Sequence, residues 1–103
     1  MTDWSDLDIW WHQELANDPA YRAEVRPLFL ELLDVRPGEL ILDLGTGTGW
    51  VLEELARRGG RGIGMEVNRT LAMAASQLGP TIIGALPDLS WCREAALDGV
   101  TAV

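Results

Sequence analysis

The sequence predicts an α/β fold in which a doubly wound parallel sheet, strands one to four, follows a set of N-terminal helices. Strand and helix patterns alternate from residue 40 onward, which is typical of a parallel sheet with right-handed crossovers. A glycine-rich run at residues 45–49 directly follows the first expected strand. Residues 2–34 instead show the helical spacing of apolar side chains. We therefore expect a helical segment over residues 1–36 and part of a doubly wound domain over residues 37–103.

The composition is that of a globular chain and excludes several functional classes. Of the 103 residues, 48% are hydrophobic and 23% are charged, which is too apolar for a disordered chain. The formal net charge of −8 should repel phosphate backbones and anionic lipid, so we expect no nucleic acid and no membrane as partners. The N-terminus is acidic, unlike a secretory signal, and the lone Cys92 fits a reducing compartment. We therefore expect a cytoplasmic protein.

The N-terminal segment is predicted to form two helices. Residues 2–16 space tryptophan and leucine three and four positions apart among carboxylates. Asp18 and Pro19 are typical of an N-cap and a first helical position, and Pro27 should kink or divide the second helix. The first helix could be a lid over a ligand or a plain packing face. His12 could be a general base or a solvated side chain, and the sequence leaves both alternatives open.

The second segment begins with a predicted turn at residues 36–38, where proline and glycine favour a tight reversal. Two helices should follow, the first ending at Gly59-Gly60 and the second at Gly79-Pro80. Asn68 is a typical N-cap of the second helix. The expected strands are 40–44, 63–67, 81–83 and 100–103, the expected helices are 51–56 and 71–78, and a loop or short helix is expected at 88–96.

The glycine-rich run has the chemistry of a ligand-binding turn. Glycines between a strand and its helix let the backbone bend sharply and let a ligand approach without an intervening side chain. The amides at the start of the helix favour an anionic group. Glu66, 23 residues after Asp43 and at the end of the second expected strand, could accept both hydroxyls of a ribose. Together these features predict a site for a nucleoside-type cofactor.

The spacing of the glycines discriminates between such cofactors. A Walker-type phosphate loop ends in Gly-Lys-Ser/Thr, and this chain contains no lysine. The dinucleotide pattern GxGxxG would need its third glycine at Trp50, whose bulk would block close packing of helix on strand. NAD is therefore the less favoured cofactor.

The residues around this loop resemble a known family. Residues 40–49, Leu-Ile-Leu-Asp-Leu-Gly-Thr-Gly-Thr-Gly, closely resemble the first motif of class I S-adenosylmethionine-dependent methyltransferases. Residues 64–68 are similar to the family's acidic motif after strand two, residues 84–91 to the stretch written GDAxxLPF, and residues 97–100 to the FDxV that opens strand four. The resemblance covers residues 28–103 and implies a partial Rossmann-like fold with S-adenosyl-L-methionine as cofactor.

The resemblance implies roles for the loop residues. Gly45, Gly47 and the backbone between them would lie against the methionyl part of the cofactor. Thr46 and Gly49 would complete the cofactor-binding loop. Asp43 would orient that loop and could reach the amino group of the cofactor through water.

The resemblance also implies which residues hold the nucleoside. Glu66 would hold the ribose diol, Met65 or Val67 would flank the adenine, and Leu86 would stack on its other face. The family often has an aspartate where this chain has Ala85. The loss of one polar contact would cost roughly 1 kcal/mol, unless Asp88 substitutes for it. No residue is expected to ligate a metal, and no catalytic residue is assigned.

The function that the resemblance implies is methyl transfer from S-adenosylmethionine to an unidentified, small-molecule acceptor. The alternatives are an inactive S-adenosylmethionine-binding fragment with a regulatory or interaction role, and a Rossmann-type nucleotide binder. The family sheet has seven strands, and this pattern stops within strand four, so we expect the isolated chain to be inactive as an enzyme. Strand four would leave an open edge, through which the chain could self-associate or bind a partner.

Overall fold

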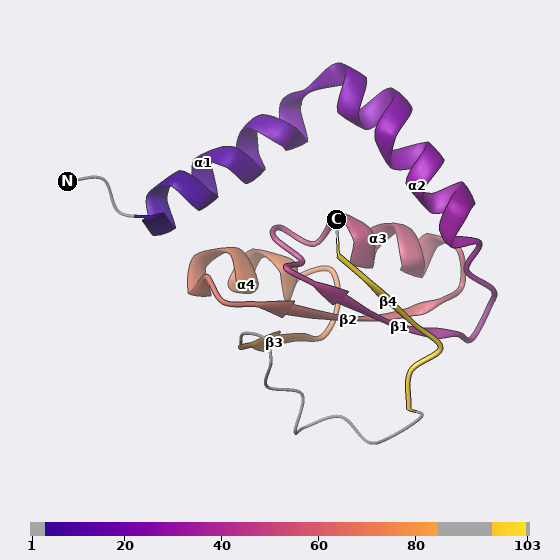
Figure 1. The fold of residues 1–103 in the computed structure, drawn as a ribbon. Helices are drawn as coiled ribbons and strands as arrows, with labels where there is room; N and C mark the ends of the chain where they lie inside the picture. Colours follow the sequence, from indigo (N-terminus) through magenta and orange to yellow (C-terminus); the bar gives the residue numbers. More distant parts are fainter. Residues whose placement is uncertain (1–3, 85–95, 103) are drawn as a thin grey trace. The chain divides into compact units, whose positions relative to one another are not determined.

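The computed structural model describes residues 4–84 and 96–102. The chain divides into two compact units, Met1–Val35 and Arg36–Val103, and the division falls one residue before the expected boundary. Figure 1 traces the elements of each unit along the chain. Among the described residues, no helix is both long enough and apolar enough to cross a bilayer.

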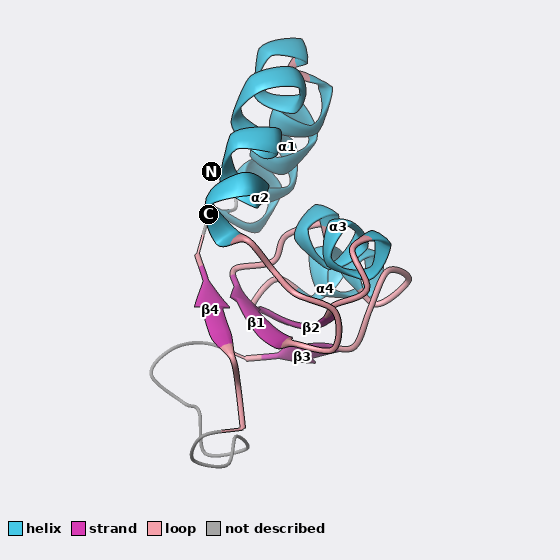
Figure 2. Ribbon diagram, turned by 90° about the vertical axis from the view of Figure 1, so that its right-hand side faces the viewer, coloured by secondary structure: helices cyan, strands magenta, loops and turns pink. Residues whose placement is uncertain are grey.

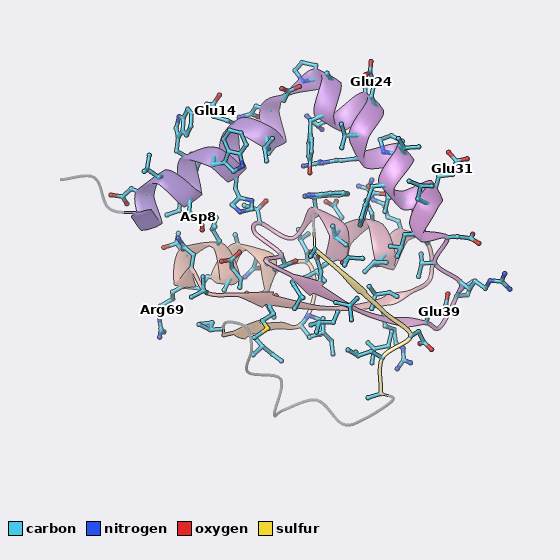
Figure 3. All side chains as sticks on the ribbon, in the orientation of Figure 1. Asp8, Glu14, Glu24, Glu31, Glu39 and Arg69 are labelled. Carbon is cyan, nitrogen blue, oxygen red and sulfur yellow. The ribbon has the colours of Figure 1, made fainter. Side chains whose placement is uncertain are left out.

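The N-terminal unit is helical, as the spacing of its apolar residues predicts. Its elements are α1 (Trp4–Asn17), a π-helical turn (Tyr21–Val25) and α2 (Arg26–Leu33). Asp18 caps the second helical stretch, because its Oδ1 accepts the amide of Tyr21 at 3.0 Å. The helical geometry changes from π to α at Arg26, whose amide donates to the carbonyl of Tyr21, and Pro27 occupies the first turn of α2. The exposed carboxylates Glu14, Glu24 and Glu31 are labelled on these helices in Figure 3.

The second unit is a four-stranded sheet in the order β3-β2-β1-β4, with all neighbouring strands parallel. Its elements are β1 (Leu40–Leu44), α3 (Trp50–Arg57), β2 (Arg61–Glu66), α4 (Arg69–Ala75), β3 (Thr81–Ile83) and β4 (Gly99–Thr101). The steps from β1 to β2 and from β2 to β3 run in the same direction across the sheet. Right-handed crossovers therefore carry α3 and α4 on the same face, as Figure 2 shows.

Pairing between strands sets boundaries that differ slightly from the expected ones. β2 begins at Arg61, two residues early, because the amide of Arg61 donates to the carbonyl of Glu39 at 2.8 Å and continues the ladder with β1. α4 ends at Ala75, and the amide of Leu78 then donates to the carbonyl of Ala75 at 2.9 Å in a tighter turn. The segment predicted at 88–96 lies almost wholly outside the described residues.

The core of the second unit forms where α3 packs on the sheet. Val51, Leu52 and Leu55 lie on one face of α3 and are buried, and Leu42 of β1 is fully buried. The opposite face of α3 is polar, with Arg57 paired to Glu53 at 2.9 Å. This amphipathic pattern anchors the helix, and therefore the loop that leads into it, against the centre of the sheet.

Candidate functional site

The glycine-rich loop, residues 45–49, connects the carboxyl end of β1 to α3. Gly45, Gly47 and Gly49 have φ angles of 63°, 59° and 93°. Residues other than glycine rarely adopt this left-handed region. The amide of Thr46 donates to the carbonyl of Met65 in β2 at 3.1 Å, and the amide of Gly49 donates to the carbonyl of Thr46 at 3.0 Å. The loop is thus tied across the ends of β1 and β2 before it enters the helix.

Asp43 holds this loop from below. Its side chain is 2% exposed, and its Oδ2 accepts a hydrogen bond from Thr46 Oγ1 at 2.7 Å. Its Oδ1 accepts one from Thr101 Oγ1 of β4, also at 2.7 Å. Burial raises the pKa of Asp43 above its ordinary value of 3.8, the two hydroxyl donors oppose this rise, and the charge of Glu66 adds to it. One carboxylate therefore connects β1, the loop and β4.

Glu66 ends β2 and is held by two backbone amides. Its side chain is 4% exposed; Oε1 accepts the amide of Gly47 at 3.0 Å, and Oε2 accepts the amide of Asn68 at 2.8 Å. An ionised carboxylate offers about four acceptor positions, so each oxygen can still accept a further donor. Asn68 in turn caps α4, because its Oδ1 accepts the amide of Leu71 at 3.2 Å. The orientation of the Glu66 carboxylate is therefore fixed before any ligand arrives.

The loop is packed on one side and open on another. A Cβ on Gly49 would lie 3.0 Å from Ala75 Cα, and a Cβ on Gly64 would lie 2.7 Å from the Thr46 methyl group, so both positions are filled by neighbouring atoms. At Gly45, which is exposed, nothing lies within 4 Å of the position a Cβ would take. The backbone at Gly45 is therefore accessible to a ligand, as a cofactor cradle requires.

The structure brings most of the predicted site residues together. The side chains or backbone of Asp43, Thr46, Gly47 and Glu66 are linked by the hydrogen bonds above, and Gly45 and Gly49 belong to the same loop. The side chain of Met65 is buried at 3% exposure, whereas that of Val67 is 67% exposed. Leu86 and Ala85 lie outside the described residues. His12 belongs to the N-terminal unit, where its Nε2 lies 3.4 Å from Asp8 Oδ1.

A cavity at the other end of the strands contains none of these residues. It has a volume of about 460 Å³ and is lined mainly by apolar groups of α3, the start of β2 and the segment before β3, including Leu52, Ala56 and Pro80. Open parallel sheets bind ligands at the carboxyl ends of their strands. We therefore assign the site to the glycine-rich loop and not to this cavity.

Thr101 is a site residue that sequence reasoning missed. It stands 58 residues after Asp43, so no local spacing connects the two. The one available signal was a hydroxyl inside an otherwise apolar strand, which is also common in ordinary strands. Asn68 was expected as a helix cap, and its second contribution, an amide to Glu66, follows from the turn geometry after β2.

Comparisons with known proteins agree with this fold. No protein-family model matches the chain. Over 61 residues it is 38% identical to a ubiquinone biosynthesis O-methyltransferase of Hahella chejuensis, a match that covers 56% of this chain and 25% of that enzyme. Its fold is similar to that of a TehB-like SAM-dependent methyltransferase from Corynebacterium glutamicum, with a TM-score of 0.65 and 22% identity over 96% of this chain and 54% of that one.

A second similar structure is a chain in the complex between the Haloferax volcanii Trm112 methyltransferase activator and a methyltransferase. The TM-score is 0.61, with 24% identity over 81% of this chain and 45% of that one. The chain thus spans a quarter of the curated relative that it matches and about half of these structures. The α/β fold and the predicted resemblance to class I S-adenosylmethionine-dependent methyltransferases are confirmed.

Proposed function

We propose that this chain binds S-adenosylmethionine at the glycine-rich loop and forms the cofactor-binding part of a methyltransferase. The observation that supports this most strongly is the Glu66 carboxylate, held by the amides of Gly47 and Asn68 beside the loop. A buried acceptor in a fixed orientation suits a ribose diol, because both of its oxygens can take a further hydroxyl donor. The open backbone at Gly45 supports a fit to the methionyl part of the cofactor.

The loop residues would position the cofactor through the backbone. Gly45, Thr46, Gly47 and Gly49 would form the wall beside the methionyl group. Asp43 would not need to touch the cofactor, because it accepts the hydroxyl of Thr46 and so fixes the loop. Preorganisation of this kind reduces the entropy that binding must otherwise remove.

The adenine would lie beyond Glu66, next to the end of β2. Val67 suits the flanking role better than Met65, because its side chain is exposed and that of Met65 is buried. The role of Leu86 is carried over from the sequence resemblance alone.

The reaction would use the methyl group that the bound sulfonium supplies. The residues of this chain would bind and orient the cofactor, and alignment of the acceptor would supply much of the rate enhancement. A small-molecule acceptor is supported by the curated relative, which is named as an O-methyltransferase of ubiquinone biosynthesis. The net charge of −8 argues against nucleic acid as the acceptor, and the lone Cys92 supports a cytoplasmic location.

Calorimetry on the whole chain tests this function. We expect S-adenosylhomocysteine, the product of the cofactor, to bind, and NAD and ATP not to bind at comparable concentrations. Binding of NAD or ATP without binding of S-adenosylhomocysteine would contradict the proposal and favour a Rossmann-type nucleotide binder. A methyl-transfer assay with a panel of small acceptors then separates a methyltransferase from an inactive cofactor-binding fragment.

A further inference from the structure

Thr101 and Asp43 face each other across two neighbouring strands. β4 pairs with β1 in parallel, and the register places Thr101 opposite Asp43. Paired residues of parallel strands project to the same face of the sheet, so the hydroxyl reaches Oδ1 over 2.7 Å. Both residues are buried, at 6% and 2% exposure. Sheet register therefore produces this contact directly, without a loop or a long side chain.

The hydroxyl of Thr101 supplies the donor to one oxygen of a buried carboxylate. Asp43 Oδ2 is satisfied by Thr46, and Oδ1 by Thr101. A buried carboxylate oxygen that loses its donor is destabilised, and the side chain then rotates toward another donor. Such a rotation would disturb the bond from Asp43 to Thr46, and with it the loop.

We propose that Thr101 is a positioning residue for cofactor binding, whose hydroxyl fixes Asp43 and thereby holds the glycine-rich loop at Thr46. This inference rests on the proposed function, because it assigns the loop to S-adenosylmethionine. Two hydrogen bonds, from Thr101 and from Thr46 to Asp43, connect β4 to the loop, so Thr101 itself need not touch the cofactor.

Two substitutions separate this role from plain packing. Thr101→Val keeps the shape of the side chain and removes the hydroxyl, whereas Thr101→Ser keeps the hydroxyl and removes the methyl group. Thr81→Val is the matched control: it also removes one hydroxyl bond from this sheet, the 3.1 Å bond to the carbonyl of Gly79 next to β3, away from Asp43. We expect Thr101→Val to weaken S-adenosylhomocysteine about tenfold, and the Ser variant and the control to stay within about threefold of the parent.

Each outcome supports or contradicts the inference. Parental affinity in Thr101→Val, or a loss in Thr101→Ser that equals or exceeds the loss in Thr101→Val, would mean that the side chain acts by packing and would overturn it. No binding by the parent chain would overturn the proposed function instead, and the inference with it.

A measurement on the parent covers the case in which Thr101→Val does not fold. The hydroxyl proton of Thr101 should be protected from exchange in an NMR spectrum, as a buried donor to a carboxylate must be. A freely exchanging hydroxyl at this position would contradict the inference.

Discussion

Two buried carboxylates, Asp43 and Glu66, lie at the carboxyl ends of neighbouring strands and are satisfied by different kinds of donor. Asp43 accepts two side-chain hydroxyls, whereas Glu66 accepts two backbone amides. Hydroxyls can rotate to accept as well as donate, but backbone amides can only donate. An asparagine amide could therefore be accommodated at Asp43, whereas the amide nitrogen of a glutamine at position 66 would face a backbone N–H that also donates.

Asp43→Asn should change the pH dependence of folding. The pKa of Asp43 is raised in the folded chain, chiefly by burial, so the folded state binds its proton more tightly than the unfolded state does. The tighter binding of this proton therefore adds to the free energy of unfolding. The contribution is fully present below pH 3.8 and is lost as the pH rises through the raised pKa of the folded state. We expect the free energy of unfolding of the parent, relative to Asp43→Asn, to fall as the pH rises from about 4.

Urea unfolding of both chains between about pH 4 and pH 8 measures this difference. Glu31→Gln removes the same charge from an exposed position and serves as the control. If the difference in free energy of unfolding between the parent and Asp43→Asn does not change with pH, burial of the Asp43 charge has little cost.

Gly49→Ala should destabilise the chain more than Gly38→Ala. Both glycines have positive φ angles, 93° and 84°, so alanine is strained at either by about 1–2 kcal/mol. A Cβ at Gly49 would also lie 3.0 Å from Ala75 Cα, whereas nothing lies within 4 Å of one at Gly38. We expect an additional loss of about 1–3 kcal/mol at Gly49, measured by urea unfolding. Equal losses at the two positions would mean that α4 moves away without cost.

Local sequence predicts most of the site at this scale. Asp43 and the loop at 45–49 are contiguous, and Glu66 ends the next strand, so spacing alone brings them together. Thr101 depends on the register of β4 against β1, which no local pattern determines. The burial of Met65 similarly depends on which face of the sheet each residue of β2 occupies.

At the scale of elements, α4 depends on its N-cap more than its length suggests. The helix runs only from Arg69 to Ala75 and buries Leu71, Ala72 and Ala75. The side chain of Asn68 satisfies the amide of Leu71, and its own amide reaches Glu66. The cap thus joins the start of α4 to the candidate site.

Asn68→Ala should reduce the free energy of unfolding by about 1 kcal/mol, because an amide at the start of α4 loses its acceptor. Asn68→Ser keeps an acceptor of similar reach and should recover most of this loss. Thermal unfolding followed by circular dichroism compares the two variants. Equal destabilisation by Ala and Ser would show that the hydrogen bond of the cap contributes little. Packing of the Asn68 side chain would then account for the loss.

The elements themselves were predictable because their signals are local. Glycines end α3, Asn68 begins α4, and short apolar runs form β1 and β3. The start of β2 at Arg61 was not predictable, because Arg61 and Gly62 enter the strand only through pairing with β1. The hydrogen bonds between β1 and β2 outweigh the low strand propensity of these residues.

At the scale of the whole molecule, β4 is the edge strand of the described sheet beside β1. Its central residue, Val100, is 55% exposed. Exposed edge strands can pair with another chain, and a charged residue on such a strand opposes this. We propose that the chain self-associates or binds a partner through β4.

Light scattering over a range of concentrations tests this association. The mean mass of the parent should rise with concentration, and Val100→Lys should reduce the rise. A stable monomer at all concentrations would contradict this expectation.

The most direct test of cofactor binding is a calorimetric cycle in which the Glu66 carboxylate and a ribose hydroxyl of the ligand are removed singly and together. The parent and Glu66→Ala are each titrated with S-adenosylhomocysteine and with its 2′-deoxy analogue. Glu53→Ala, which removes a partly exposed carboxylate of α3, is the control. We expect Glu66→Ala to weaken S-adenosylhomocysteine by roughly 1.5–3 kcal/mol. Removal of the 2′-hydroxyl should weaken binding to the parent and have much less effect in Glu66→Ala. A folded Glu66→Ala chain that binds S-adenosylhomocysteine as the parent does would contradict the assignment of this site.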